Sequence, residues 1–106
     1  MPRVLRRRYI GVRVDSESEV DRKRLADAVY DSLLGLFGEF GASLAELRLI
    51  DYYPKSKCAI FRCTHKALEM VKASIVAVKE VDGKKASTQI VCVSGTLKAL
   101  RKKLIP

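Results

Sequence analysis

The 106-residue sequence predicts an α+β domain. Some short segments alternate apolar and polar residues, which predicts strands, while others repeat apolar residues every three to four positions, which predicts helices. The two kinds of segment alternate along the chain. Apolar residues make up 48% of the sequence, which favours a folded globule, and the length is typical of one domain, here residues 1–106.

The first strand is expected at residues 7–14, RRYIGVRV, preceded by a basic arm at residues 1–7. The following SESE has the form of a capping box, with Ser16 as N-cap and Glu19 three residues later. Apolar residues then recur at helical spacing, and Gly38 and Gly41 are expected to end this helix. Its expected buried stripe comprises Leu25, Val29, Leu33, Leu36 and Phe40.

The rest of the chain predicts two more strands, a helix, a fourth strand and a short terminal helix. Strands are expected at 44–53 and 58–63 around a PKSK turn, and a helix at about 64–78. After a VDGKK turn come a strand at 86–93 and a helix at 96–104. This order, βαββαβ with an extra C-terminal helix, predicts a ferredoxin-like or RRM-like fold with an antiparallel four-stranded sheet.

Charge is unevenly distributed along the sequence. The net charge is +9, yet residues 15–46 hold eight acidic and three basic residues, net −5. The other 74 residues hold 18 basic and four acidic residues, net +14. Such polarity predicts one surface that binds a polyanion, most simply nucleic acid. The alternative is a generally basic thermophile protein, which the absence of Asn and the single Gln would also suit.

The stretch VSGTLKALRKK takes the last strand directly into a cationic helix. Ser94 or Thr96 would cap that helix, and Gly95 would let a ligand approach the backbone. A helix N-terminus attracts anions, and the helix carries Lys98, Arg101 and Lys102. These features predict a phosphate-binding site, with an ordinary capped surface helix as the alternative.

Two further regions have the chemistry of an RNA interface. The basic arm, with Arg6, Arg7 and Arg8 at its end, is suited to phosphates. The sheet face away from the two long helices offers either a platform for stacked bases or a surface that something covers. We expect cover, by the terminal helix or a second protein, because KCAIFRC lacks the aromatic signature of an RNA-recognition motif. This face is expected to carry Tyr9, Arg13, Arg48, Ile50, Tyr52, Ile60 and Arg62.

The first helix has more apolar surface than one buried stripe needs. Tyr30, Leu34 and Phe37 form a second stripe, flanked by Asp27 and Asp31. An acidic rim repels RNA and suits a protein partner. The alternative is that Leu34 and Phe37 pack under the following loop.

Little in the sequence indicates an enzyme acting alone. His65 is the one histidine, and there is no P-loop, zinc motif or nucleophile–base pair. Ferredoxin-like phosphatases typically pair an arginine with an asparagine, which this chain lacks. The three cysteines are expected to be free thiols. No stretch has the length of a membrane span or the form of a signal peptide, so a cytoplasmic location is expected.

Four segments together resemble the ribonuclease P protein component 2 family, the archaeal counterpart of a small subunit of the eukaryotic enzyme. They are RRYIGVRV, GLFGEFGASLAELRLIDY, AIFRCTH and VCVSGTLKAL, in the family's order and spacing from about residue 7 to residue 100. Phe61 stands where an aliphatic residue is expected.

The resemblance implies a subunit of the endoribonuclease that removes the 5′ leader from precursor tRNA. It implies that the RNA is the catalyst and uses Mg²⁺, and that this chain has no catalytic residue and binds no cofactor. The implied partners are the RNA's catalytic domain and a larger barrel-like protein subunit, with self-association into a two-plus-two assembly. Alternatives are another ribonucleoprotein or ribosomal RNA-binding module and, less favoured, a small ferredoxin-like phosphatase.

Residues and resemblance together give the candidate sites. The candidate RNA-binding residues are Arg6, Arg7, Arg8, Arg62, His65, Ser94, Gly95, Thr96, Lys98, Arg101 and Lys102. The candidate protein-partner residues are Asp27, Tyr30, Asp31, Leu34 and Phe37.

Overall fold

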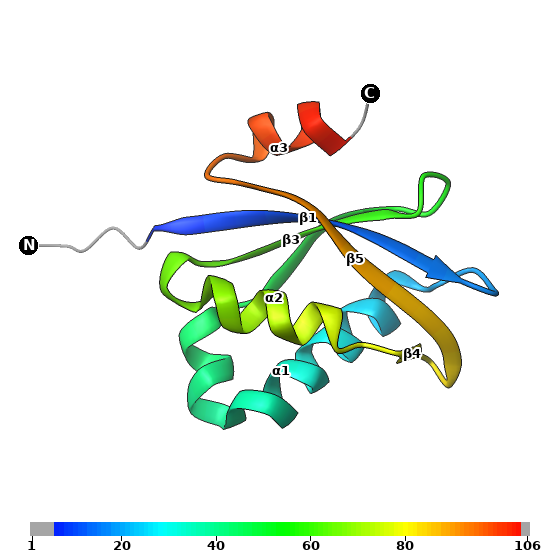
Figure 1. Ribbon diagram of the computed structural model, residues 1–106, viewed down its shortest axis with the longest axis horizontal. Coiled ribbons are helices and arrows are strands. Elements are labelled where there is room, and N and C mark those ends of the chain that lie inside the picture. The colour runs from blue at the N-terminus through cyan, green and yellow to red at the C-terminus, as the bar shows by residue number, and fades with distance from the viewer. Residues whose placement is uncertain (1–5, 105–106) are drawn as a thin grey trace, which may run out of the picture.

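The computed structural model describes residues 6–104. Two helices, α1 (Arg22–Ala45) and α2 (Leu68–Val76), pack on one face of an antiparallel sheet. A third helix, α3 (Leu97–Leu104), lies on the other face (Figure 1). The predicted α+β class is therefore confirmed. Residues 1–5 of the predicted basic arm lie outside the described residues, and Arg7 already belongs to the first strand.

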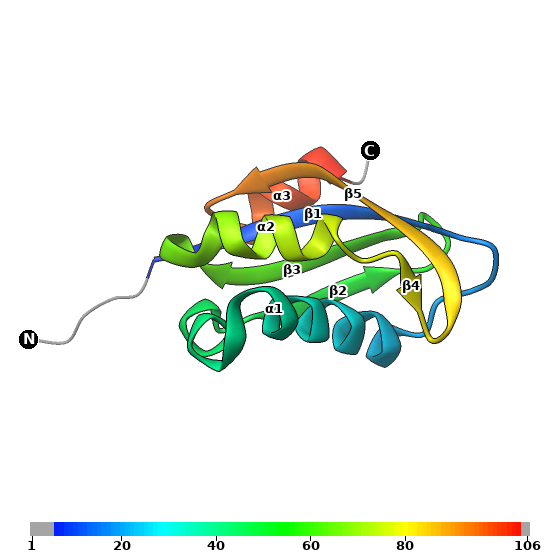
Figure 2. The ribbon, with the colours of Figure 1, turned by 60° about the horizontal axis from the view of Figure 1, so that its bottom comes forward.

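The sheet has five strands in the order β2-β3-β1-β5-β4. They are β1 (Arg7–Ser16), β2 (Arg48–Tyr53), β3 (Cys58–Thr64), β4 (Glu80–Val81) and β5 (Lys84–Ser94). Without β4, the order is that of the predicted split β-α-β arrangement, with β1 central between β3 and β5 (Figure 2).

The predicted count of four strands is wrong, because β4 forms a hairpin with β5. Glu80 pairs with Lys85, and Val81 with Lys84. The two residues between them, Asp82 and Gly83, have φ values of 54° and 76°. Two successive residues with positive φ are characteristic of the tight type I′ turn that connects antiparallel strands. The segment predicted only as a turn therefore also supplies a short edge strand.

The main core lies between the sheet and the two long helices. β1 contributes Ile10, Val12 and Val14 to it. α1 contributes Leu25, Val29 and Leu33, as predicted. Phe61 of β3 is only 1% exposed, so the core accommodates the aromatic ring in this position. Burying these side chains removes apolar area from water, at about 25 cal/mol per Å².

The predicted capping box is wrong. Helix α1 begins at Arg22, and the side chain of Asp21 caps it by accepting a hydrogen bond from the Arg24 N–H at 3.3 Å. Ser16 instead ends β1, where it pairs with Ala86 and donates its hydroxyl to the Lys85 carbonyl. Strand pairing thus extends to the residue that local sequence favours as a helix cap.

The predicted break at Gly38 is present, but a second helical segment of α1 follows it to Ala45, and Gly41 lies inside that segment. Gly38 has φ 73° and ψ −178°, a conformation essentially restricted to glycine, and it interrupts the helical spacing. The predicted stripe leaves the core after the buried Leu33, and the kink accounts for this at Phe40. Leu36 is 54% exposed and Phe40 is 83% exposed, so their predicted burial is wrong.

The helix predicted at about 64–78 is shorter. It consists of a 3₁₀ turn at His65–Ala67 followed by α2 at Leu68–Val76. Val71 and Ile75 are buried on its inner side. No helix among the described residues is long and apolar enough to cross a membrane.

The predicted cover on the second sheet face is confirmed, and it is α3. Leu100 and Leu104 form a cluster with Ile60 of β3, against which Tyr9, Ile50 and Tyr53 pack. Tyr52 was expected on this face but packs in the main core. The cause is a bulge in β2, where the register shifts between Leu49 and Asp51 and reverses the later side chains.

Gly11 of β1 allows α3 to lie close to the sheet. A Cβ atom at this position would be 2.9 Å from Cys92 Sγ and 3.1 Å from Leu104 Cδ1. We expect Gly11→Val to destabilise the protein by about 1–3 kcal/mol, as overpacking does. Valine has a high strand propensity, so the loss of stability would come from the clash with α3 and not from the strand. It should therefore be largest in α3. Denaturant unfolding measures the loss of stability, and amide hydrogen exchange at Leu100 and Leu104 measures the local effect on α3. Unchanged exchange would mean that α3 does not depend on Gly11 for its position on the sheet.

Candidate nucleic-acid interface

The two predicted basic regions meet at one end of the sheet, where β1 begins. Arg7 lies opposite Thr64 and Arg8 lies opposite Cys63 across the β1–β3 pair. The backbone N–H of His65 donates to the Arg6 carbonyl at 2.8 Å. Backbone pairing thus places Arg6, Arg7 and Arg8 next to the AIFRCTH segment.

The end of β5 joins the same region from the other side of β1. Ser94 pairs with Tyr9, and Arg8 Nη1 lies 3.5 Å from where a Cβ of Gly95 would be. The Thr96 hydroxyl accepts the Ala99 N–H at 3.2 Å, so Thr96, not Ser94, caps α3. Helix α3 therefore begins at Leu97, two residues after the glycine that lies beside Arg8.

The cations of α3 differ in their surroundings. Lys98 and Lys102 are exposed, and no salt bridge joins either to another described residue. Arg101 instead forms a hydrogen-bonded ion pair with Asp51 of β2. Hydrogen bonding to Asp51, and secondarily to Tyr53, raises the pKa of the Arg101 guanidinium. Arg101 therefore holds α3 to β2, which leaves it less available to an external anion.

The arginines of β1 also differ. Arg7 Nη2 lies 3.8 Å from Glu46 Oε1, whereas Arg8 donates to the Arg7 carbonyl at 3.1 Å and has no acidic partner among the described residues. Burial raises the pKa of the Cys63 thiol opposite Arg8 to about 11, while the charge of Arg8 acts in the other direction. Cys63 is thus protonated at neutral pH and is not an activated nucleophile.

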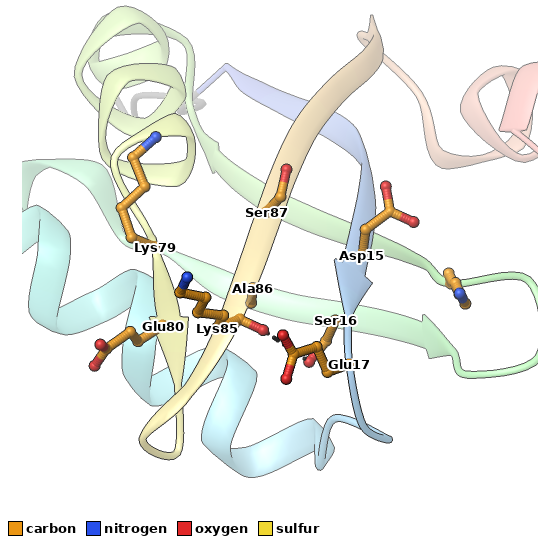
Figure 3. A pocket seen from close by; sticks show the side chains of 9 residues that line it. Asp15, Ser16, Glu17, Lys79, Glu80, Lys85, Ala86 and Ser87 are labelled. Atoms are coloured by element: carbon orange, nitrogen blue, oxygen red, sulfur yellow. Dashed lines mark hydrogen bonds between the residues drawn. The ribbon is translucent and has the colours of Figure 1, made fainter.

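A hollow of about 590 Å³ lies at the opposite end of the sheet, between β1 and β5 and beside β4 (Figure 3). The charges of the residues that line it are balanced, with lysines at 57, 79 and 85 and carboxylates at 15, 17 and 80. A balanced surface does not attract a polyanion strongly. The charge pattern therefore favours the end where β1 begins.

The predicted protein-partner residues lie on α1 but do not form one exposed stripe. Tyr30 is 46% exposed and Phe37 38%, and Asp27 and Asp31 are exposed, whereas Leu34 packs partly against the main core. The sequence pattern predicts burial of Leu36 and Phe40 and therefore misses the larger part of the exposed apolar surface of α1. We call the exposed apolar residues of the second half of α1 the α1 apolar patch: Leu36, Phe37, Phe40 and Leu44.

Fold and charge together define a small α+β protein with a cationic surface at one sheet end and an apolar patch on the helical face. The model of the Rpp14/Pop5 family matches residues 8–105. The chain is 31% identical to ribonuclease P protein component 2 of Pyrococcus abyssi, over 92% of this chain and 83% of that one. It is 33% identical to ribonuclease P protein component 2 of Archaeoglobus fulgidus, over 94% and 89%.

The chain belongs to the Rpp14/Pop5 family. The resemblance drawn from the four sequence segments is therefore confirmed. The fold is also similar to a chain in the cryo-EM structure of yeast ribonuclease MRP, with a TM-score of 0.71 and 17% identity. That alignment covers 92% of this chain and 79% of the yeast chain.

Proposed function

We propose that this protein is a subunit of ribonuclease P that binds the phosphates of the enzyme's RNA and so supports removal of the 5′ leader from precursor tRNA. Family membership supports the assignment to the holoenzyme. The single observation that supports RNA binding is the convergence of Arg8, the Ser94–Thr96 turn and the start of α3 at one sheet end. The protein contributes cations, and the bond is cleaved in a site formed by the RNA.

The mechanism we propose is electrostatic. RNA phosphates that fold close together repel one another, and Lys and Arg side chains reduce this repulsion as Mg²⁺ does. Phosphate contacts position an RNA without reading its bases. The absence of Asn from the chain is consistent with binding to the backbone and to shape. In this scheme Mg²⁺ belongs to the RNA, and the protein lowers the concentration required.

We further propose that the α1 apolar patch and its acidic rim bind the larger, barrel-like protein subunit of the enzyme. Asp27, Asp31 and Glu39 on α1 would repel RNA and would attract a protein with a basic rim. The proposed assembly contains two copies of each protein subunit, acts on precursor tRNA and is located in the cytoplasm.

The magnesium requirement tests this function. We expect ribonuclease P RNA with this protein and its partner subunit to cleave precursor tRNA at a lower Mg²⁺ concentration than RNA alone. Cleavage rates measured across a Mg²⁺ titration give the midpoint for each assembly. An unchanged midpoint would contradict the electrostatic mechanism. Recovery of a different RNA with the purified protein would instead indicate another ribonucleoprotein, and phosphatase turnover without RNA would indicate an enzyme.

A further inference from the structure

We propose that Arg48 and Arg62 form a phosphate-binding subsite for the RNA backbone, at the end of the sheet that α3 leaves uncovered. This inference rests on the proposed function and specifies its contact surface. Arg62 belongs to the predicted RNA-binding residues, but Arg48 does not.

The strand register places the two arginines in one row across four strands. Arg48 of β2 lies opposite Arg62 of β3, and Arg62 lies opposite Tyr9 of β1. Tyr9 in turn lies opposite Ser94 of β5. The row thus runs from the edge strand to the turn that begins α3, and it spans three inter-strand spacings, roughly 14 Å.

All of these side chains share the face that α3 covers farther along. The chain neighbours Leu49, Phe61 and Ile10 belong to the main core on the other face. Because successive side chains in a strand alternate, Arg48, Arg62 and Tyr9 point away from that core. The next row along, Ile60 with Gly11, lies under Leu100 and Leu104. Arg48 itself is exposed and Arg62 is half-buried.

The charges of this pair are not compensated within the protein. Directly opposite residues in antiparallel strands have Cβ atoms about 5 Å apart, and like charges there are unfavourable. Within residues 6–104, no acidic group forms a salt bridge with Arg48 or Arg62. Arg62 Nε is buried without any hydrogen-bond partner. Buried polar atoms nearly always have one, so this atom indicates a guanidinium held in place by packing for an external anion.

Another arginine on the same face shows the contrast. Arg13 lies four residues along β1 from Tyr9, is exposed, and forms an ion pair with Asp15 at 3.5 Å. Two adjacent guanidinium groups without carboxylates match the geometry of a phosphate, which accepts bidentate hydrogen bonds. Ser94 at the other end of the row connects this subsite to the turn beside Arg8.

The test compares Arg48→Gln with Arg13→Gln as the matched control. Binding of ribonuclease P RNA is measured over a range of salt concentrations, together with thermal unfolding of each free protein. We expect Arg48→Gln to weaken binding about tenfold, to reduce the salt slope by about 0.7–0.9 and to leave the midpoint of unfolding unchanged or higher. Arg13→Gln should change neither the affinity nor the slope appreciably.

Equal slopes for wild type, Arg48→Gln and Arg13→Gln would overturn the subsite while leaving the proposed function intact. Failure of the wild-type protein to bind this RNA would overturn both. A loss confined to binding of the larger protein subunit, with an unchanged RNA slope, would assign the arginine pair to a protein interface and overturn the subsite. As a measurement that requires no folded variant of Arg62, its Nε–H resonance in wild type should shift when the RNA is added; an unmoved resonance counts against the proposal.

Discussion

Replacing Arg8, Lys98 and Lys102 together by glutamine is expected to weaken the binding of ribonuclease P RNA by about 100-fold at moderate salt. Each contact between a cation and an RNA phosphate contributes about 0.7–0.9 to the salt slope, so losing three should reduce the slope by between about 2 and 3. The affinity follows from three contacts that remain accessible to solvent, at about 1 kcal/mol each, which together correspond to roughly 100-fold. Filter binding or fluorescence anisotropy across a salt series measures both quantities.

None of these three residues forms an ion pair with another described residue, so their charges are available to an external phosphate. Arg101 is left unchanged, because it pairs with Asp51 and its removal would also loosen α3. Glutamine keeps much of the aliphatic stem of each side chain, which limits the loss of packing around Arg8.

A matched control removes the same charge from the opposite end of the sheet. Lys55, Lys79 and Lys85 are exposed lysines around the balanced hollow and the β2–β3 turn. Their triple replacement by glutamine should reduce the slope by less than 1, through the smaller net charge alone. If both triple variants lose the same affinity, binding depends on net charge, and the interface at the start of β1 is refuted.

The order of the strands was predictable because it depends on patterns that are local. Alternation in RRYIGVRV and helical spacing at Leu25, Val29 and Leu33 each report which side of an element is apolar. The PKSK turn makes β2 and β3 antiparallel, and the place of β1 between β3 and β5 follows from the split β-α-β arrangement. The convergence of the basic regions follows in turn, because β1 lies beside β5 and the two strands run in opposite directions.

Other features depend on contacts or backbone conformations that no local pattern encodes. The β2 bulge moves Tyr52 to the opposite face, yet RLIDYY reads as an uninterrupted strand. The kink at Gly38 takes Phe40 out of the core, although its spacing from Leu33 and Leu36 is helical. Ser16 has the local sequence of a cap, but the hydrogen bond to the Lys85 carbonyl retains it in the sheet. In each case a tertiary interaction or a glycine conformation overrides a local preference.

Contacts between elements that are distant in the sequence also explain why only part of each candidate site could be predicted. Arg62 is predicted to bind RNA because it lies in a segment shared with the family. Arg48 becomes a candidate only because the strand register places it opposite Arg62. Phe40 and Leu44 become surface residues because α1 continues, kinked, beyond Gly38.

Replacing Phe40 by glutamate is expected to weaken binding of the larger ribonuclease P protein subunit by at least about 100-fold. Phe40 is 83% exposed, so the fold should lose little stability, within roughly 0.5 kcal/mol. At an interface, the loss of a central aromatic side chain costs about 2 kcal/mol or more. The new carboxylate adds a buried charge beside an already acidic rim, which raises the cost further. Isothermal titration calorimetry with the purified partner measures the affinity.

Val91→Glu supplies the matched control, since Val91 is an exposed apolar residue, 51% accessible, on β5 rather than on α1. It should leave the affinity for the partner unchanged. The α1 apolar patch adjoins the start of β1, since the Thr64 hydroxyl opposite Arg7 donates to the Leu44 carbonyl. The salt slope of RNA binding by Phe40→Glu is therefore measured as well, and we expect it to fall by less than the roughly 0.7–0.9 of one phosphate contact. The alternative is that the patch binds a second copy of this chain, and light scattering tests it. In that case Phe40→Glu would lower the mass of the isolated protein without lowering its affinity for the partner. Partner binding as tight as wild type, with an unchanged mass, would refute the role of the patch altogether.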